Sequence, residues 1–347
     1  MNRLESEQVR EGIRCPVFIV GSPRSGTTLL RVTLNRHSRL AVCGETDYFR
    51  RLHGRRQAFG DPGKVQNRAR IVDAYLGIEP VRRLGMDIGV LRERLMSEGV
   101  SWRDLFAALL QAYADFQGKP FAGEKTPKHA LHIDTLCEWF PNCTIIHLVR
   151  DPRAAVCSLT KVPWASRSVL MGARTWRLFN VAASAASSRD NYIRVKYEEL
   201  VARPEEQLSR LCNRIGLEYE AAMLRANPAE FDPRRPVHRA WEPITESRAA
   251  LWQTELTAWQ VAAIEAAVAD EMDEFGYERR TSGATNPSML RARLEALTEM
   301  GFQKLFRFPC AFYRFFQPTN LADEQKWIAR ASVMYGRVRL PRAAGAP

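Results

Sequence analysis

One short segment near the start of the chain constrains the fold more than any other. An apolar run at residues 16–20 is followed by GSPRSGTT at residues 21–28, and a helical pattern covers residues 27–36. A short apolar run that ends at a glycine is typical of a buried parallel strand. Strand, glycine-containing loop and helix in this order predict a loop whose backbone N–H groups surround a phosphate. The dipole at the helix N-terminus adds to that attraction.

The loop departs from a nucleoside-triphosphate loop at one informative position. Its glycines have the G-x-x-x-x-G spacing of a Walker A motif, but Thr27 stands where that motif has lysine. Thr28 keeps the hydroxyl of the following position, and Arg24 places a positive charge three residues upstream of Thr27. Because the lysine that reaches the β- and γ-phosphates is missing, ATP hydrolysis is a poorer fit. The pattern predicts one bound phosphate, with cationic stabilisation of a group that is transferred.

A second phosphate-binding signal follows the strongest predicted strand, CTIIHLV at residues 143–149. Arg150 comes directly after this strand, and Ser158 lies about two turns into the helix that Pro152 opens. Open α/β sheets bind ligands at the carboxyl ends of their strands. Arg150 can form a bidentate pair with a phosphate there, and Ser158 can add a hydroxyl donor. The alternative is a local ion pair of Arg150 with Asp151 that caps the helix.

The order of elements predicts an α/β fold. Further strands are expected at residues 40–43, 120–124 and 192–196. Residues 50–118 read as mainly helical, and further helices are expected over 129–140, 169–190, 198–200, 204–215 and 258–275. This alternation predicts a P-loop-like, three-layer α/β/α domain with a mainly parallel central sheet. We expect it to cover residues 1–280, followed by a helical, aromatic and basic C-terminal extension over residues 281–347.

Composition narrows the class of partner. The net charge of +12 fits anionic partners, but no RRM, zinc-finger or basic-zipper pattern accompanies the arginines, so we expect no nucleic acid. The N-terminus has no apolar signal core and the chain has no long apolar run, which predicts a cytoplasmic protein. The segment GFQKLFRFPCAFYRFFQP, at residues 301–318, is either a helical segment packed on the core or a peripheral membrane patch.

Cysteine and histidine patterns indicate neither a disulfide framework nor a metal site. The seven cysteines are odd in number and contain no CxxC pair, and the chain has no HExxH motif or histidine cluster. We therefore expect reduced thiols and no bound metal.

Together, the two phosphate motifs resemble those of the sulfotransferases that use 3′-phosphoadenosine 5′-phosphosulfate (PAPS). The loop at residues 21–28 resembles their 5′-phosphosulfate loop, and Arg150 with Ser158 eight positions later resembles their 3′-phosphate motif. The string PRSGTT is most similar to the bacterial and tyrosylprotein-type branch, since the cytosolic branch usually has lysine at the position of Arg24. Further matching stretches are GEKTPKHA at 123–130, VKYEEL at 195–200 and ESRAALWQTEL at 246–256.

The resemblance implies an enzyme that moves a sulfuryl group from PAPS, its co-substrate, to a hydroxyl-bearing acceptor without a metal. It also implies the residues of the nucleotide site. These are Arg24, Ser25, Gly26, Thr27 and Thr28 at the 5′-phosphosulfate, Arg150 and Ser158 at the 3′-phosphate, and Tyr197, Ser247 and Arg248 completing the site.

Sulfuryl transfer sets two further demands: cationic groups at the leaving oxygen, and a base for the proton of the acceptor. Arg24 and Lys125 are the candidates for the cationic groups. Glu45, in CGETDYF, resembles the glutamate base of the carbohydrate and tyrosylprotein enzymes, and Asp47 is the competing candidate. His129 and His132 lie outside the histidine motif of the cytosolic branch and are expected to be structural or to line the acceptor site.

The sequence leaves the acceptor open. A hydroxyl of a carbohydrate, lipid or small metabolite is favoured, and a peptide tyrosine is the alternative within the family. A P-loop nucleotide kinase or NTPase is the rival enzyme, and a basic nucleic-acid or membrane-surface binding protein is the rival outside enzymes. No pattern indicates the oligomeric state.

Overall fold

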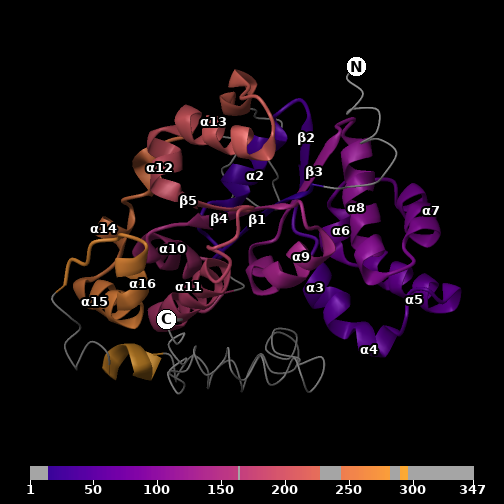
Figure 1. The fold of residues 1–347 in the computed structure, drawn as a ribbon. Helices are drawn as coiled ribbons and strands as arrows, with labels where there is room; N and C mark the ends of the chain where they lie inside the picture. Colours follow the sequence, from indigo (N-terminus) through magenta and orange to yellow (C-terminus); the bar gives the residue numbers. More distant parts are fainter. Residues whose placement is uncertain (1–14, 163–164, 227–243, 282–289, 296–347) are drawn as a thin grey trace, which may run out of the picture. The chain divides into compact units, whose positions relative to one another are not determined.

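A computed structural model describes residues 15–162, 165–226, 244–281 and 290–295 (Figure 1). The chain divides into two compact units. Unit 1 comprises Met1–Asp151 and Ala182–Ala250, and unit 2 comprises Pro152–Val181 and Leu251–Pro347. The expected boundary near residue 280 stays a prediction, because most of the extension over residues 281–347 lies outside the described residues.

Unit 1 is built around a five-stranded sheet in the order β2-β3-β1-β4-β5, in which every neighbouring pair is parallel. The strands are β1 (Val17–Gly21), β2 (Leu40–Cys43), β3 (Phe121–Lys125), β4 (Thr144–Val149) and β5 (Tyr192–Lys196). The predicted mainly parallel sheet is confirmed. Since β1 lies between β3 and β4, the chain moves to one side of β1 for β2 and β3 and to the other side for β4 and β5. The carboxyl end of β1 is therefore the switch point of the sheet.

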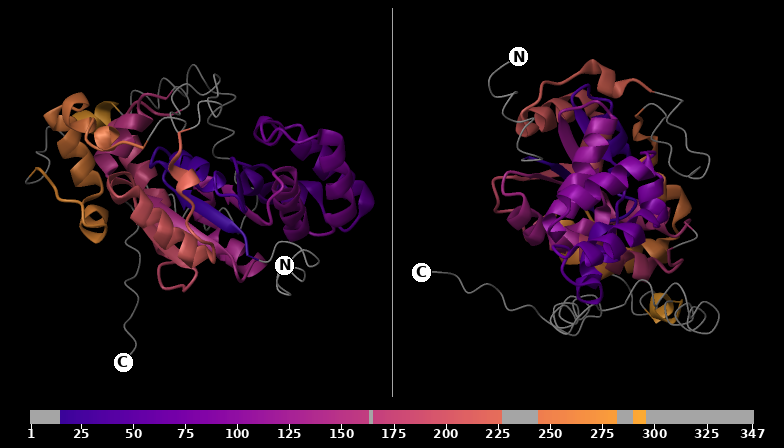
Figure 2. Two further views of the ribbon diagram at one scale, coloured as in Figure 1. Left: turned by 90° about the horizontal axis from the view of Figure 1, so that it is seen from above. Right: turned by 90° about the vertical axis from the view of Figure 1, so that its right-hand side faces the viewer.

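The helices of unit 1 lie between these strands and after β5. They are α2 (Thr27–Asn35), α3 (Tyr48–Arg51), α4 (Arg56–Phe59), α5 (Val65–Leu76), α6 (Glu79–Arg82), α7 (Ile88–Glu98), α8 (Trp102–Phe116), α9 (Ile133–Trp139), α12 (Tyr197–Ala202) and α13 (Pro204–Ile215), with 3-10 turns η1 (His53–Arg55), η2 (Pro127–His132), η3 (Ala221–Leu224) and η5 (Glu246–Arg248). The helices between β2 and β3 extend beyond the β2 end of the sheet (Figures 1 and 2), and α8 packs on β2 and β3.

Successive side chains of β1 pack into two different cores, because strand residues alternate between the faces of a sheet. Val17 and Ile19 join a buried cluster with Leu30 of α2 and the apolar residues of α13. Phe18 lies on the other face, with its ring centroid 6.0 Å from that of Phe106 in α8. Figure 1 shows α2 and α13 on one side of the sheet and α9 on the other. A strand that is apolar on both faces is what a sheet covered on both faces requires.

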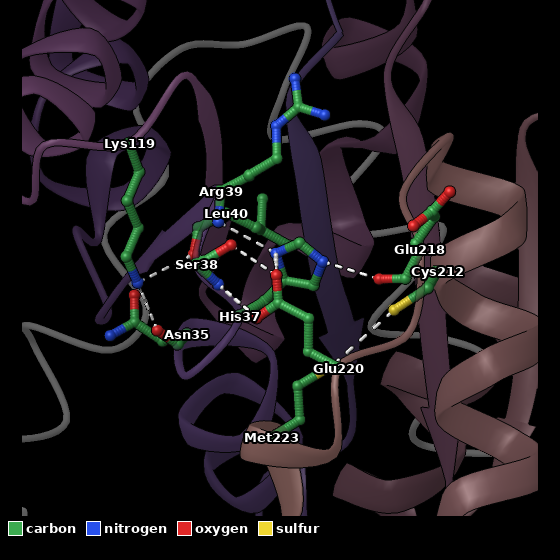
Figure 3. A network of polar contacts seen from close by, with 10 residues as sticks. All are labelled: Asn35, His37, Ser38, Arg39, Leu40, Lys119, Cys212, Glu218, Glu220 and Met223. Carbon is green, nitrogen blue, oxygen red and sulfur yellow. Dashed lines mark hydrogen bonds and ion pairs between the residues drawn. The ribbon is translucent and has the colours of Figure 1, made fainter.

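A polar network ties the loop before β2 to the segment after α13, at the amino-terminal edge of the sheet (Figure 3). The backbone N–H of Arg39 donates to His37 Nδ1 at 3.0 Å, so that nitrogen carries no proton, and Nε2 donates to the carbonyl oxygen of Glu218 at 2.8 Å. The carboxylate of Glu220 accepts from the backbone N–H of Ser38 at 2.8 Å and from the Ser38 hydroxyl. These bonds join two segments that are far apart in sequence.

Three expected helices differ from the observed ones. The helix expected over residues 129–140 starts as the 3-10 turn η2, and only α9 is α-helical. The helix expected over 258–275 is split at Val268, whose φ of −136° and ψ of 32° lie outside the helical region. The helix expected over 169–190 ends at Ser184. Breaks of one residue leave the spacing of apolar positions almost unchanged, so periodicity alone does not locate them.

Unit 2 is helical, and the buried carboxylate of Glu265 links three of its segments by hydrogen bonds. Its helices are α10 (Pro152–Leu159), most of α11 (Val169–Ser184), α14 (Trp252–Glu255), α15 (Ala258–Ala267) and α16 (Ala269–Glu274). Glu265 is 1% exposed and accepts hydrogen bonds from Arg153 Nη1 at 2.7 Å and from the backbone N–H groups of Arg280 and Thr281. The Arg153 guanidinium also lies 4.1 Å from the ring centroid of Trp252. Thr281, the first residue of the expected extension, and Arg280 before it are therefore bonded to α15.

We expect Glu265→Gln to lower the free energy of unfolding by about 1–3 kcal/mol at neutral pH, since a buried charged acceptor is lost. Burial alone raises the pKa of Glu265, but the hydrogen bonds from Thr281, Arg280 and Arg153 outweigh it and hold the pKa below its usual value. The stabilisation is full above the unfolded pKa of about 4.3 and is lost as the pH falls through the folded pKa. Denaturant titrations should show a difference in unfolding free energy between wild type and variant that is constant from about pH 7 to about pH 5 and shrinks below about pH 4. A difference that stays constant down to about pH 3 would contradict this.

Candidate active site

The connections that follow the five strands emerge at one edge of the sheet, because all the strands are parallel. The loop at residues 21–28 follows β1, Glu45 lies two residues after β2, Lys125 ends β3, Arg150 follows β4 and Tyr197 follows β5. All of these residues belong to unit 1. Residues from five distant parts of the chain thus meet at the edge where open α/β sheets bind ligands.

The loop after β1 has a backbone that only glycine permits at two positions. Gly21 has a φ of 144°, and a Cβ there would lie 2.4 Å from the carbonyl oxygen of Leu148 in β4. Gly26 has a φ of 95° at the N-cap of α2, and a Cβ there would lie 2.4 Å from Tyr197 Cδ2. Arg24 also has a positive φ, of 71°. No side chain caps α2, so the helix dipole and the first N–H groups of the helix are available to an anion.

The hydroxyl of Ser25 is the clearest sign that this loop fits a phosphate. Ser25 is fully buried, and its Oγ has no hydrogen-bond partner within the protein. A buried hydroxyl without a partner is costly, so such groups call for an explanation. A phosphate oxygen held in the loop would accept a hydrogen bond from it.

Three arginines converge beside the loop. The pKa of Arg24 is lowered by burial and by the charges of Arg150 and Arg248, while the charge of Glu45 opposes this. Arg150 donates from its guanidinium to the carbonyl oxygen of Arg24 at 3.1 Å and to that of Arg248 at 2.5 Å. Like charges this close repel one another in a partly buried site. An anion placed among them would relieve that repulsion, so the arrangement suits a ligand with several negative charges.

Tyr197 packs against both Arg150 and the start of α2. It is the first residue of α12 and is buried. The guanidinium of Arg150 lies 4.3 Å from its ring centroid, and the same ring leaves no room for a Cβ at Gly26. The aromatic ring therefore holds Arg150 and the start of α2 in position.

Lys125 and Glu45 form an ion pair in which the lysine side chain is buried and the glutamate side chain is exposed. Lys125 Nζ donates to Glu45 Oε1 at 2.6 Å, and the side chain of Lys125 is 1% exposed whereas that of Glu45 is 38% exposed. The charge of Glu45 also acts on Arg24. The structure thus brings together the three expected catalytic residues, with the carboxylate at the surface and the ammonium beneath it. Their catalytic roles stay predictions.

Asp47, the competing base, is engaged in a different way. It has a φ of 51°, and its carboxylate pairs with Arg50 and lies 3.9 Å from Arg51 Nε. Burial by itself raises the pKa of Asp47, but the hydrogen bond and charge of Arg50 outweigh it, with help from Lys128, and the pKa is lowered. Both carboxylates have a cationic partner, but the side chain of Asp47 is 12% exposed whereas that of Glu45 is 38% exposed, so an acceptor hydroxyl can reach Glu45 more readily.

The two histidines after Lys125 pack against Phe49. The rings of His132 and Phe49 stack with centroids 4.5 Å apart, and the ring of His129 meets Phe49 edge-on at 4.9 Å. His129 is buried, with Nδ1 3.0 Å from Glu124 Oε2. These contacts are what a structural role requires, and lining of the acceptor site, the other expected role, stays a prediction.

The other residues expected in the nucleotide site lie in three different elements, α2, η5 and α10. Thr27 and Thr28 open α2, next to Gly26. The hydroxyl of Ser247 in η5 lies 2.8 Å from Thr245 Oγ1, and Arg248 contributes its backbone carbonyl to Arg150. Ser158 belongs to α10 in unit 2, whereas Arg150 belongs to unit 1.

Metal-ligand clusters, membrane-spanning helices and disulfides are all absent from the described residues. Over these ranges, the structure has no group of three or more histidine, cysteine, aspartate or glutamate residues that could hold a metal ion. Within the same part of the chain, no helix is both long and apolar enough to cross a membrane. None of the described cysteines is in a disulfide, and Cys310, with the rest of the basic aromatic segment at 301–318, lies outside the described residues.

Sequence reasoning missed the polar cluster beneath the Glu45 loop. Glu124, Thr46 and Thr126 are all buried, and both threonine hydroxyls donate to the same oxygen of Glu124. The available signal was a carboxylate at a core-facing position of β3, within the stretch GEKTPKHA.

Comparisons with known proteins agree with this geometry. The model of the sulfotransferase family matches residues 16–221, which is more than half of the chain. Nodulation protein NoeE of Sinorhizobium fredii is 25% identical over 323 residues, covering 84% of this chain and 72% of that protein. Protein-tyrosine sulfotransferase 2 of Gallus gallus is 27% identical over 221 residues, covering 60% of this chain and 53% of that enzyme.

Solved structures show the same fold. The sulfotransferase domain from the Synechococcus PCC 7002 olefin synthase superimposes with a TM-score of 0.55 at 24% identity, covering 78% of this chain and 97% of that domain. The sulfotransferase domain from the curacin biosynthetic pathway superimposes with a TM-score of 0.52 at 21% identity, covering 77% of this chain and 99% of that domain.

Proposed function

This chain belongs to the sulfotransferase family, and from that premise we propose that it transfers a sulfuryl group from PAPS to an acceptor hydroxyl. The observation that carries the proposal is the phosphate loop with its buried Ser25 hydroxyl, beside the converging Arg24, Arg150 and Arg248. A nucleotide with a 5′-phosphosulfate and a 3′-phosphate has the two anionic ends that such a site can bind.

In this proposal, the N–H groups and hydroxyls of residues 25–28 bind the 5′-phosphosulfate. Arg150 binds the 3′-phosphate, and Tyr197, Ser247 and Arg248 complete the nucleotide site. A part for Ser158 at the 3′-phosphate stays a prediction from the sequence motif. The support comes from the α2 N-terminus and from the placement of Arg150 at the end of β4. PAPS supplies the activated sulfuryl group, and the residues of this chain hold and orient it.

The proposed transfer is an in-line displacement. Glu45 takes the proton of the attacking hydroxyl, and its exposed carboxylate is where an acceptor can reach it. Arg24 and Lys125 stabilise the negative charge that develops on the oxygen between sulfur and phosphorus. The ion pair with Lys125 also orients the Glu45 carboxylate.

The test is a thermal shift with 3′-phosphoadenosine 5′-phosphate (PAP), compared with ADP and ATP, with and without magnesium. A ligand present at about 100 times its Kd stabilises a protein by about 2.7 kcal/mol, which is readily measured. We expect a shift that is specific to PAP and independent of magnesium. A magnesium-dependent shift with ATP alone would instead identify a kinase or NTPase.

For the acceptor we propose a hydroxyl of a carbohydrate, a lipid or a small metabolite. The second candidate is a peptide tyrosine, which the names of several relatives favour. Incubation with radiolabelled PAPS and matched acceptor panels separates the two, because label will appear on only one class at low acceptor concentration.

A further inference from the structure

Two consecutive residues of β3 hold two consecutive residues of the loop after β2. Lys125 donates to Glu45, and Glu124 accepts from Thr46. The register explains this arrangement, because Cys43 of β2 pairs with Glu124 of β3 and the chain beyond Cys43 therefore passes the end of β3. Since neighbouring strand residues point to opposite faces, the loop is held from both sides.

The contacts of Glu124 converge on one loop residue. Its Oε1 accepts from the backbone N–H of Thr46 at 3.2 Å, from Thr46 Oγ1 at 3.0 Å and from the hydroxyl of Thr126. Its Oε2 lies 3.0 Å from His129 Nδ1. The carboxylate therefore fixes both the backbone and the side chain of Thr46, the residue next to Glu45.

Stability alone does not account for a carboxylate at this position. Glu124 is fully buried and is in register with Phe18, on the face of the sheet where Phe106 packs. Removing a carboxylate from water is costly even where hydrogen bonds compensate it, and a well-packed apolar residue is often as stable or more so. What the carboxylate provides at this place is a rigid attachment for the Glu45 loop.

We propose that Glu124 is a positioning residue, which acts through Thr46 to hold Glu45 in its ion pair with Lys125 and in line with the acceptor. The inference rests on the proposed function, in which Glu45 is the base. Glu124 itself does not touch the reacting atoms in this scheme, so its effect must pass through Glu45.

The test uses Glu124→Leu, which removes the acceptor oxygens but fills the space, and Glu124→Gln, which keeps one acceptor oxygen. Hydrogen exchange of the peptide over residues 44–49 is measured on the full chain without nucleotide. We expect exchange to be about tenfold faster in Glu124→Leu, because a hydrogen bond to a charged group is lost, and close to the wild-type rate in Glu124→Gln. Thr46→Val keeps the size of the side chain but removes its hydroxyl contacts with Glu124 and with the backbone N–H of Tyr48, and it serves if Glu124→Leu does not fold.

Kinetics supply the second readout. We expect Glu124→Leu to lower kcat by about 100-fold while the affinity for PAP stays at the wild-type value, because misplacing a reacting group by about 1 Å can cost this much. In a Glu45→Gln background, Glu124→Leu should have no further effect. Glu124→Gln should recover most of kcat.

A matched control exists in unit 1. Glu220 accepts from the backbone N–H and hydroxyl of Ser38, just as Glu124 does from Thr46, but at the other edge of the sheet. Glu220→Leu should speed exchange around Ser38 and leave kcat unchanged.

Unchanged exchange over residues 44–49 in Glu124→Leu, or losses of kcat that multiply with those of Glu45→Gln, would overturn the inference. If wild type transfers no sulfuryl group, the proposed function fails, whereas the exchange measurement still decides the positioning role.

Discussion

Glu45→Gln should reduce sulfuryl transfer by about 10²–10⁴-fold, the usual contribution of a general base. Glutamine keeps the size of the side chain and an oxygen that can accept from Lys125 Nζ, so the local fold should persist. It cannot take a proton from an acceptor hydroxyl. Single-turnover transfer from PAPS measures the chemical step, and PAP binding should remain at the wild-type level, since Glu45 is not among the residues proposed to hold the nucleotide.

Asp47→Asn is the matched comparison for Glu45→Gln. The carboxylate of Asp47 is bonded to Arg50 and its pKa is lowered, so its loss should affect kcat far less. If Glu45→Gln is fully active and Asp47→Asn is not, the base has been assigned to the wrong carboxylate of this loop.

Arg150→Lys should weaken binding of PAP by about 10–100-fold, the range expected when a hydrogen bond to a charged group is lost. Lysine keeps the charge but not the planar guanidinium that stacks on Tyr197 and donates to two backbone carbonyls. Binding of AMP, which has no 3′-phosphate, should fall much less. Calorimetric titration with both nucleotides measures the difference.

Arg203→Lys is a suitable control for Arg150→Lys. Arg203 is exposed and pairs with Glu206 on the surface of unit 1, so its replacement should leave both affinities unchanged. Equal losses for PAP and AMP in Arg150→Lys would remove Arg150 from the proposed 3′-phosphate site and leave it a structural role.

The strands and the loops that follow them could be predicted from the sequence, because their signals are local. β2 and β5 have the expected bounds. β1 and β3 are each shifted by one residue towards the C-terminus, and β4 starts one residue later than expected. Short apolar runs bounded by glycine, proline or turn residues define such strands. The parallel order then places Lys125, Arg150 and the loop at residues 21–28 at one edge, so the meeting of these residues follows from topology.

The contacts within the site could not be predicted, because their partners are distant in sequence. Glu124 and Thr46 are 78 positions apart, and only the pairing register of β2 and β3 brings them together. The break at Val268 and the 3-10 turn η2 were also missed, since neither interrupts the apolar spacing. The amino-acid composition gives no sign of the division into two units, which places Ser158 in one unit and Arg150 in the other.

The mutual repulsion of Arg24, Arg150 and Arg248 has a practical consequence for handling the protein. We expect such a site to bind sulfate or phosphate from a buffer, because a small dianion would reduce this repulsion. Such an ion stabilises the folded chain by mass action and competes with the nucleotide. Melting temperatures recorded in phosphate will therefore be raised, and nucleotide affinities measured there will be lowered. Zwitterionic buffers with chloride as the only anion give the undisturbed values.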